Sequence, residues 1–355
     1  MGSEMCIRDR YTIVSPTNAT STASTAGTAN AVYQINVGSD VSFFDYGWNT
    51  GSWNSFEWNT PRPPTVLGLS LGSRVWQFDN YGQDLILQLA NGPIFQWSPD
   101  SGLSTRATAI AGAPTKSMFA LVSTPDRHLV CFGTESVIGT PTSQDPMFVR
   151  FSSQENIGEF VATATNTAGG QRLTDGNEIV SALRSRGQIL IWTDTALHGQ
   201  QYIGPPFTFG FQQLGANCGI IGPHACADVN GVAYWMSKDA FFVFDGTVKK
   251  LPSTVQDYVY KDINLAQGFA VNVAINTQFN EVTWFYPTAD SSYVNRSVTY
   301  NYLENVWSNG SLARTAWRDV GSFPAPLATK YDPEAVQASL TPIIGLTPGR
   351  SILYN

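Results

Sequence analysis

Short apolar runs alternate with turn residues along most of the chain from Val32 onward. Each run is rich in Val, Ile, Phe, Tyr and Trp and is bounded by Gly, Asn, Asp, Ser or Pro, which is the pattern of a β-strand. The predicted strands are 75–78, 84–89, 93–97, 128–132, 188–192, 232–236, 240–244, 281–287 and 297–302. Helix-compatible spacing occurs only within 174–186 and 252–268, so we predict an all-β protein with one or two short helical turns.

Tight turns pair several of these strands into antiparallel hairpins. Asn91-Gly92 separates 84–89 from 93–97, and this dipeptide favours the positive φ angles of a type I′ turn. Ser237-Lys238-Asp239 separates 232–236 from 240–244, and Asp245-Gly246 closes the second of these strands.

Comparable strands recur at similar intervals along the chain. They start near Leu85, Leu129, Ile189, Val232 and Val282, so the intervals are 44, 60, 43 and 50 residues. Four-stranded propeller blades repeat every 40 to 50 residues or so, and loop insertions lengthen the period. We therefore predict an irregular β-propeller built of antiparallel hairpin blades, with a β-sandwich or two small β domains as the alternative.

The ends of the chain differ from this repeating part. Residues 1–10 (MGSEMCIRDR) resemble translated sequencing-adapter read-through, and residues 11–31 form a low-complexity arm rich in Ser, Thr, Ala and Asn. Residues 32–66 are rich in Trp and Gly. We place the propeller at 67–325 and a C-terminal extension at 326–355, for which truncation is left open as an interpretation.

The charge balance argues against stable binding of nucleic acid. Among 355 residues, 20 Lys and Arg stand against 27 Asp and Glu, for a net charge of −7, and no basic run occurs. Proteins that grip phosphates are basic. A channel through which DNA slides is compatible with this balance. No apolar stretch is long enough to cross a membrane, so no membrane insertion is expected.

Candidate metal ligands are few. The cysteines are Cys6, Cys131, Cys218 and Cys226, too scattered for a disulfide framework. Cys218, His224 and Cys226 are weak candidates for a zinc site, because a fourth ligand and the usual spacing are missing. Two buried free cysteines are the favoured interpretation.

Catalytic signatures are equally weak. Gly68-Leu69-Ser70-Leu71-Gly72 matches the elbow that exposes a nucleophilic serine, but a strand-like segment follows it where that motif requires a helix. His128 reads as a satisfied core or edge histidine. We therefore predict a non-enzymatic protein with no catalytic residues and no cofactor.

The tryptophans of the 32–66 segment are candidate contact residues. Trp48, Trp53 and Trp58 recur every five residues, so an extended chain would direct the rings to alternating faces. An aromatic-rich loop at a subunit contact and a Trp-rich hairpin folded into the domain remain open as interpretations.

Two stretches carry a resemblance to a known family. DYGWNTGSWNSFEWNTPR (45–62), with VYQINVG (32–38) before it, looks like the Trp-Gly segment that precedes the propeller in phage tail proteins. LIWTDTALHGQQYIGPPFTFGFQQLG (190–215) and the segment 218–260 resemble the central region of the family called tail tubular protein B, tail nozzle or packaged-DNA stabilisation protein. Residues 188–260 are the most specific part.

The resemblance implies a structural virion protein of a tailed bacteriophage, assembled in the host cytoplasm. Six copies would form a ring beneath the portal and adaptor proteins, carry tail fibres or spikes, and enclose the channel for DNA ejection without sequence-specific binding. Tyr202, Phe207 and Phe209 are further candidate interface residues, because aromatic side chains bury large areas at interfaces. The alternative function is a receptor- or carbohydrate-binding tail propeller, with or without glycan-cleaving activity.

Overall fold

The computed structural model of the chain describes residues 75–331, except 125, 205, 292 and 322–324, together with 351–354. The predictions for residues 1–74, including Trp48, Trp53, Trp58 and Ser70, lie outside the described residues.

The described part of the chain contains six antiparallel sheets, numbered 1 to 6 in chain order. Sheets 1 and 2 consist of β1 (Trp76–Tyr81), β2 (Asp84–Leu89), β3 (Ile94–Trp97) and β4 (Thr108–Ala109), then β5 (Phe119–Ser123), β6 (His128–Phe132), β7 (Phe148–Phe151) and β8 (Gly169–Arg172). Sheets 3 and 4 consist of β9 (Ile179–Ser185), β10 (Gln188–Thr193), β11 (Ala196–Gly204) and β12 (Thr208–Ala216), then β13 (Cys226–Val229), β14 (Val232–Met236), β15 (Phe241–Phe244) and β16 (Val248–Lys250). Sheets 5 and 6 consist of β17 (Asn272–Asn276), β18 (Glu281–Tyr286), β19 (Arg296–Asn301) and β20 (Val306–Gly310), then β21 (Ala316–Arg318), β22 (Leu327–Tyr331) and β23 (Ser351–Tyr354).

Helical structure is short and lies in connections. The described helices are α1 (Gln256–Asp262) and the 3-10 turns η2 (Pro99–Ser101), η3 (Pro141–Ser143) and η4 (Leu265–Ala270). None of the helices in these ranges is long and apolar enough to span a membrane. The helical turns expected within 252–268 are confirmed by α1 and the start of η4.

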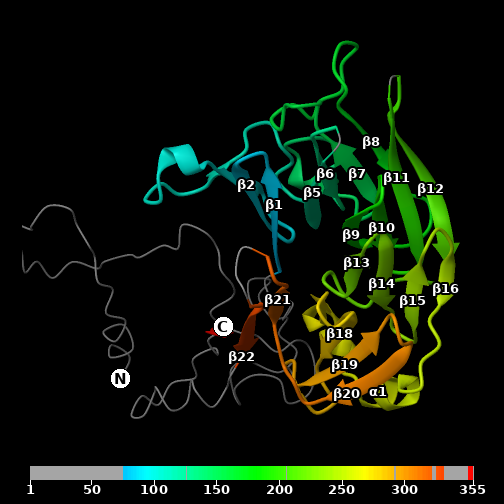
Figure 1. Ribbon diagram of the computed structural model, residues 1–355. Coiled ribbons are helices and arrows are strands. Elements are labelled where there is room, and N and C mark those ends of the chain that lie inside the picture. The colour runs from blue at the N-terminus through cyan, green and yellow to red at the C-terminus, as the bar shows by residue number, and fades with distance from the viewer. Residues whose placement is uncertain are drawn as a thin grey trace, which may run out of the picture. The chain divides into compact units, whose positions relative to one another are not determined.

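The six sheets follow one another around a common centre, as Figure 1 shows from the blue-green strands of sheet 1 to the orange strands of sheet 6. Every sheet is an up-and-down meander of neighbouring strands, and its first strand contacts the first strand of the next sheet, from β1 and β5 to β17 and β21. Meandering sheets arranged in this way are the blades of a propeller. The chain is therefore an all-β protein with an irregular β-propeller fold.

The predicted repeat corresponds to one particular strand of each blade. Leu85, Leu129, Ile189, Val232 and Val282 lie in β2, β6, β10, β14 and β18, the second strands of sheets 1 to 5. These strands give the strongest signal because a central strand is covered on both faces and reads as a continuous apolar run.

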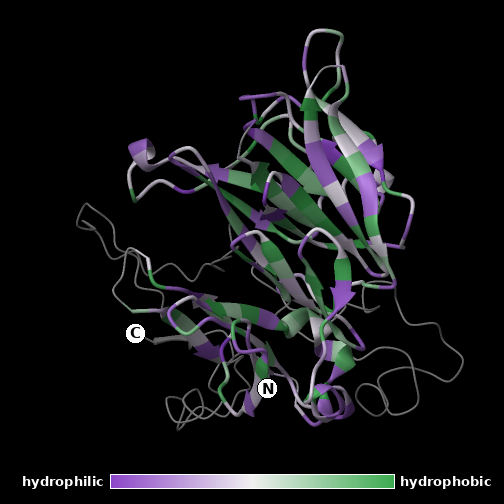
Figure 2. Ribbon diagram, turned by 45° about the vertical axis from the view of Figure 1, so that its right-hand side comes forward, coloured by the Kyte–Doolittle hydropathy of each residue, from purple (hydrophilic) through white to green (hydrophobic). Residues whose placement is uncertain are grey.

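The hydrophobic core lies between successive sheets, where green hydrophobic bands cross the strands in Figure 2. In β10, Ile189 and Ile191 pack into a cluster shared with sheet 2, whereas Leu190 and Trp192 pack into a cluster shared with sheets 4 and 5. Successive side chains of a strand point to opposite faces, so one continuous apolar run joins its sheet to both neighbours.

Tryptophan indoles also bond one blade to another. Trp235 Nε1 donates to the carbonyl oxygen of Cys218 at 2.9 Å, and Trp284 Nε1 donates to that of Ala225 at 3.0 Å. Trp317 Nε1 donates to Ile275 O at 2.9 Å. Each bond satisfies a polar atom of a large apolar ring. Trp192, Trp235, Phe242 and Trp284 are buried and belong to the structural core.

One ion pair ties three blades together. Arg184 in β9 contacts Asp79 in β1 through both of its terminal nitrogens, at 2.6 and 2.9 Å. The amide of Val122 in β5 donates to Asp79 Oδ2 at 2.7 Å, and Arg184 Nη1 donates to Val122 O at 2.8 Å. We call Asp79, Val122 and Arg184 the three-blade clamp.

The helix-compatible spacing within 174–186 gave a wrong prediction. Residues 179–185 form β9, which pairs with β10 from Gln188↔Ser185 to Thr193↔Ile179. The sequence IVSALRS also fits one helical face, but pairing within the sheet overrides that weak local preference.

The predicted type I′ turn at Asn91-Gly92 is also wrong in detail. β2 and β3 do form an antiparallel hairpin, but only Asn91 has a positive φ, whereas a type I′ turn requires both central residues there. Asn230 and Gly231, between β13 and β14, both have positive φ and connect Val229 directly to Val232.

Sheet 6 crosses the boundary expected between residues 325 and 326. β22 pairs with β21 and with β23, so strands assigned to a C-terminal extension belong to a blade. Their short runs gave no signal of a repeat.

Candidate functional site

The β11–β12 hairpin is a candidate contact surface. Its two nine-residue strands are the longest in the described part of the chain, and Figure 1 shows it extending beyond the rest of sheet 3. Phe207 at its tip is 74% exposed, and Ile203 and Tyr202 are also exposed. We call Tyr202, Ile203 and Phe207 the hairpin tip.

Phe209 does not belong to this exposed surface, which corrects the prediction made for it. Its side chain is 4% exposed, and its ring lies 4.8 Å from that of Phe151 and 5.1 Å from that of His128 between ring centroids. Thr208 has a φ of 62°, which is unusual for a β-branched residue. This conformation interrupts strand alternation, so that Phe207 points to solvent and Phe209 into the core.

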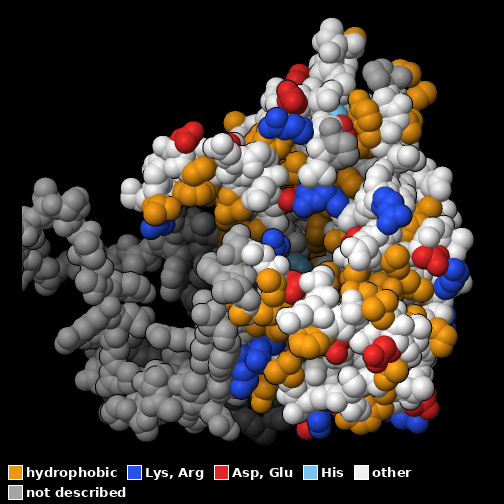
Figure 3. Space-filling model, viewed as in Figure 1, with side chains coloured by type: hydrophobic (Ala, Val, Ile, Leu, Met, Phe, Trp, Pro, Cys, Tyr) orange, Lys and Arg blue, Asp and Glu red, His pale blue; other side chains and the backbone are white. Residues whose placement is uncertain are grey.

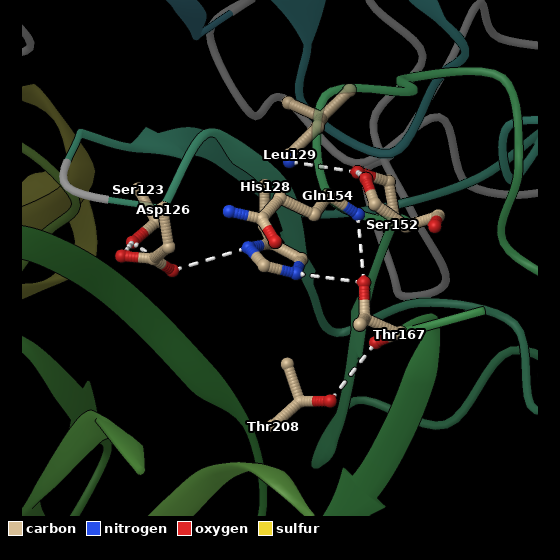
Figure 4. A network of polar contacts seen from close by, with 9 residues as sticks. Ser123, Asp126, His128, Leu129, Ser152, Gln154, Thr167 and Thr208 are labelled. Atoms are coloured by element: carbon tan, nitrogen blue, oxygen red, sulfur yellow. Dashed lines mark hydrogen bonds and ion pairs between the residues drawn. The ribbon is translucent and has the colours of Figure 1, made fainter. Parts of the chain in front are cut away.

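A buried polar network fixes the base of the hairpin to sheet 2 (Figure 4). His128 Nδ1 lies 3.1 Å from Asp126 Oδ2, and His128 Nε2 lies 3.2 Å from Thr167 Oγ1. Ser123 Oγ donates to both oxygens of Asp126 at 2.9 and 3.0 Å. Thr208 Oγ1 donates to Thr167 O at 3.1 Å, which links β12 to the connection between β7 and β8.

Asp126, His128 and Thr167 are connected as the acid, base and hydroxyl of a hydrolytic triad are. Asp126 and His128, however, lie in the buried core. The imidazole is fully buried under Phe151 and Phe209, and Thr167 Oγ1 also accepts a hydrogen bond from Gln154 N at 2.8 Å. A nucleophile needs an open approach to its oxygen and its base. The network therefore holds the hairpin in place, and His128 is confirmed as a buried core histidine.

The three candidate zinc ligands do not converge. Cys218 packs in the core cluster shared by sheets 3, 4 and 5, whereas Cys226 Sγ lies 3.5 Å from Ser181 Oγ and His224 Nε2 lies 3.4 Å from Gln77 Nε2. Among the described residues, no group of three or more His, Cys, Asp or Glu side chains is placed to hold a metal. Burial raises the pKa of Cys218 to about 11 and that of Cys226 to about 12, whereas zinc binds the thiolate.

A second site that the sequence did not indicate lies at the centre of the propeller. The first strands of all six sheets contribute to a cavity of about 1010 Å³, which we call the axial cavity. Figure 3 shows a hollow near the centre of this face, bordered by hydrophobic and charged side chains. Its lining includes Trp76, Gln77, Phe78, Ser181, His224, Asn272, Thr315 and Trp317. The pairing order of the sheets brings these residues together across some 240 positions of sequence, and no local pattern marks them.

Comparisons with known proteins add little to this geometry. No protein-family model and no curated protein sequence matches the chain. The computationally designed protein Ika8 is 12% identical with a TM-score of 0.42, and the similarity covers 71% of this chain and 66% of that chain, just under two thirds of its length. The AfRom2 CNH domain is 12% identical (TM-score 0.41, covering 70% of this chain and 74% of that one). A chain of the mitotic checkpoint complex is 13% identical (TM-score 0.42, covering 72% of each). Similarity this low carries no argument about function.

Proposed function

We propose that the protein is a structural subunit of a tailed-phage virion, one copy of the nozzle or hub ring that forms the DNA exit channel and retains packaged DNA. The proposal starts from the family resemblance, whose most specific part, residues 188–260, contains the whole β11–β12 hairpin. In this proposal the ring, of six copies, docks beneath the portal and adaptor proteins and carries fibres or spikes.

The hairpin tip is the observation that most supports a contact role. Tyr202, Ile203 and Phe207 are exposed apolar side chains on a protruding element, and the network around His128 fixes the base of that element. A contact surface that is already ordered loses little conformational entropy on association. A tip that meets a different surface of the next copy makes a heterologous contact, and such a contact forms a ring when the rotation between copies closes.

In this proposal the DNA channel is enclosed between subunits and does not run through a single propeller. The axial cavity, at about 1010 Å³, has the size of a small-molecule site and cannot pass a duplex. The net charge of −7 fits a lumen that lets DNA slide. We predict that acidic residues face this lumen, and a basic lumen would contradict that part of the proposal.

Light scattering of the full chain at several concentrations, with and without purified portal–adaptor complex, tests the proposal. We expect a ring, or a ring that forms only on the adaptor. Phe207→Ser is expected to reduce assembly, whereas Phe279→Ser, which changes an exposed phenylalanine between β17 and β18, is expected to leave it unchanged. A monomer that stays indifferent to the adaptor would overturn the proposal.

A further inference from the structure

The axial cavity has an uncharged wall. No Asp, Glu, Lys or Arg is among its described lining residues, which are aromatic, aliphatic, amide, hydroxyl, thiol and imidazole side chains. A charged ligand would be removed from water with no opposite charge to pair with, which is unfavourable. This wall therefore disfavours nucleotides, phosphates and acidic ligands.

The imidazole in the wall is held in its neutral form. Gln77 Nε2 lies 3.4 Å from His224 Nε2, and His224 also has a hydrogen bond to the backbone of Trp76. Burial lowers the pKa of His224, and the bond to Trp76 opposes this only in part. At neutral pH the side chain links β1 to the segment just before β13 without adding charge to the cavity.

An aromatic platform forms one side of the cavity. The rings of Trp76 and Phe78 are stacked, with centroids 6.2 Å apart and an angle of 15° between planes. Phe78 is 62% exposed although it belongs to the cavity lining. Trp317 contributes a second indole from sheet 6, and its N–H is already bonded to Ile275 O. These faces present apolar surface to a ligand.

A neutral polar group completes the wall. Asn272 Nδ2 donates to Arg314 O at 2.9 Å, which fixes the orientation of the amide. Its Oδ1 is buried and has no hydrogen-bond partner among the described residues. A buried acceptor left unsatisfied destabilises a protein, and an O–H donor in the cavity would satisfy it, either directly or through a water.

We propose that the axial cavity binds an uncharged saccharide. A sugar ring has an apolar C–H face that packs on an aromatic ring, and it carries uncharged hydroxyl groups that suit amide and hydroxyl side chains. Sites for small ligands combine a mainly apolar lining with a few polar groups in this way. In this arrangement Trp76 and Phe78 stack on the sugar, and Asn272 orients its hydroxyls.

Titration calorimetry of the full chain tests this site, with maltotriose, cellotriose and tri-N-acetylchitotriose as neutral probes and trigalacturonate as the acidic comparison. We expect at least one neutral trisaccharide to bind and trigalacturonate not to bind. Phe78→Ala is expected to weaken binding about fivefold, the usual scale of one aromatic contact. Phe279→Ala removes a similarly exposed phenylalanine, 58% against 62%, outside the cavity, and is expected to change nothing.

Three results would overturn the inference: no binding of any neutral probe at millimolar concentration, equal binding of trigalacturonate, or binding that Phe78→Ala and Asn272→Ala both leave unchanged. Thermal melting of each variant identifies any loss of folding, and Phe78→Ala is the variant least prone to it because the side chain is exposed. The site is independent of the ring proposal. A chain that assembles without binding sugar would remove only this inference, and a monomer that binds sugar would remove only the ring.

Discussion

The core cluster shared by sheets 3, 4 and 5 and the hairpin tip use the same kind of side chain in opposite ways. Trp192, Trp235 and Trp284 are fully buried, and the last two bond to backbone carbonyls of neighbouring segments. Phe207 at the tip is instead largely exposed. Aromatic content alone therefore says little about function, and burial within the blade decides whether a ring is structural or available to a partner.

The largest effect is expected in the core cluster. Trp235→Ala removes a buried indole that packs on Trp192 and Phe242 together with its bond to Cys218. Large-to-small changes of this kind cost about 3–5 kcal/mol. Urea unfolding is expected to show this loss. A loss below about 1 kcal/mol would mean that the region relaxes around the cavity, contrary to the close packing described.

The three-blade clamp is expected to rank second. Asp79→Ala leaves Arg184 and the amide of Val122 without their acceptor, which is expected to lower the free energy of unfolding by about 1–3 kcal/mol. Asp245→Ala is the matched control, because its partner Lys249 lies 2.7 Å away, close to the 2.6 Å of the Asp79–Arg184 pair, but both side chains are exposed, and exposed pairs contribute little to stability. Equal effects of the two substitutions in urea unfolding would contradict a role for the clamp.

The free energy of unfolding is expected to depend on pH through the buried histidine His198. Burial lowers the pKa of His198, opposed in part by Asp175, so the unfolded chain binds the proton more tightly. Stability is then full above the unfolded pKa of about 6.5 and falls as the pH drops through it toward the folded pKa. His198→Leu is expected to flatten the decline in unfolding free energy between about pH 7.5 and about pH 5.5. Part of the decline is expected to remain in this variant, because burial also lowers the pKa of His224. An unchanged slope in the variant would argue against a neutral, buried His198.

The smallest effect on stability is expected at the hairpin tip. Phe207→Ser is expected to change the free energy of unfolding by less than about 0.5 kcal/mol, as for other exposed positions. Its thermal midpoint should match that of the unchanged chain while its assembly is reduced. A large loss of stability would mean that Phe207 belongs to the folded core.

The sequence predicted the parts of the fold that each strand encodes by itself. The second strands of sheets 1 to 5 stood out because they are apolar on both faces. β8, with the sequence GGQR, and β21, with AWR, gave no such signal, since they are short and mostly exposed. Phe209 was predicted as an interface residue because the positive φ of Thr208, which turns the Phe209 ring into the core, cannot be inferred from alternation.

The axial cavity could not be predicted for a different reason. Its lining takes at least one residue from each of six sheets, and Trp76 and Trp317 meet there only through the order of the blades. The separation of Cys218 from His224 and Cys226 likewise depends on which face of the blade each residue occupies. Closeness in sequence had suggested a shared site where the fold provides none.

Electron microscopy of the full chain mixed with purified portal–adaptor complex tests the ring most directly. We predict end-on views with rotational symmetry in which six copies surround a central channel, and a loss of these views for Phe207→Ser but not for Phe279→Ser. Single propellers that never associate with the adaptor, at any concentration, would contradict the assignment of this chain to a DNA exit channel.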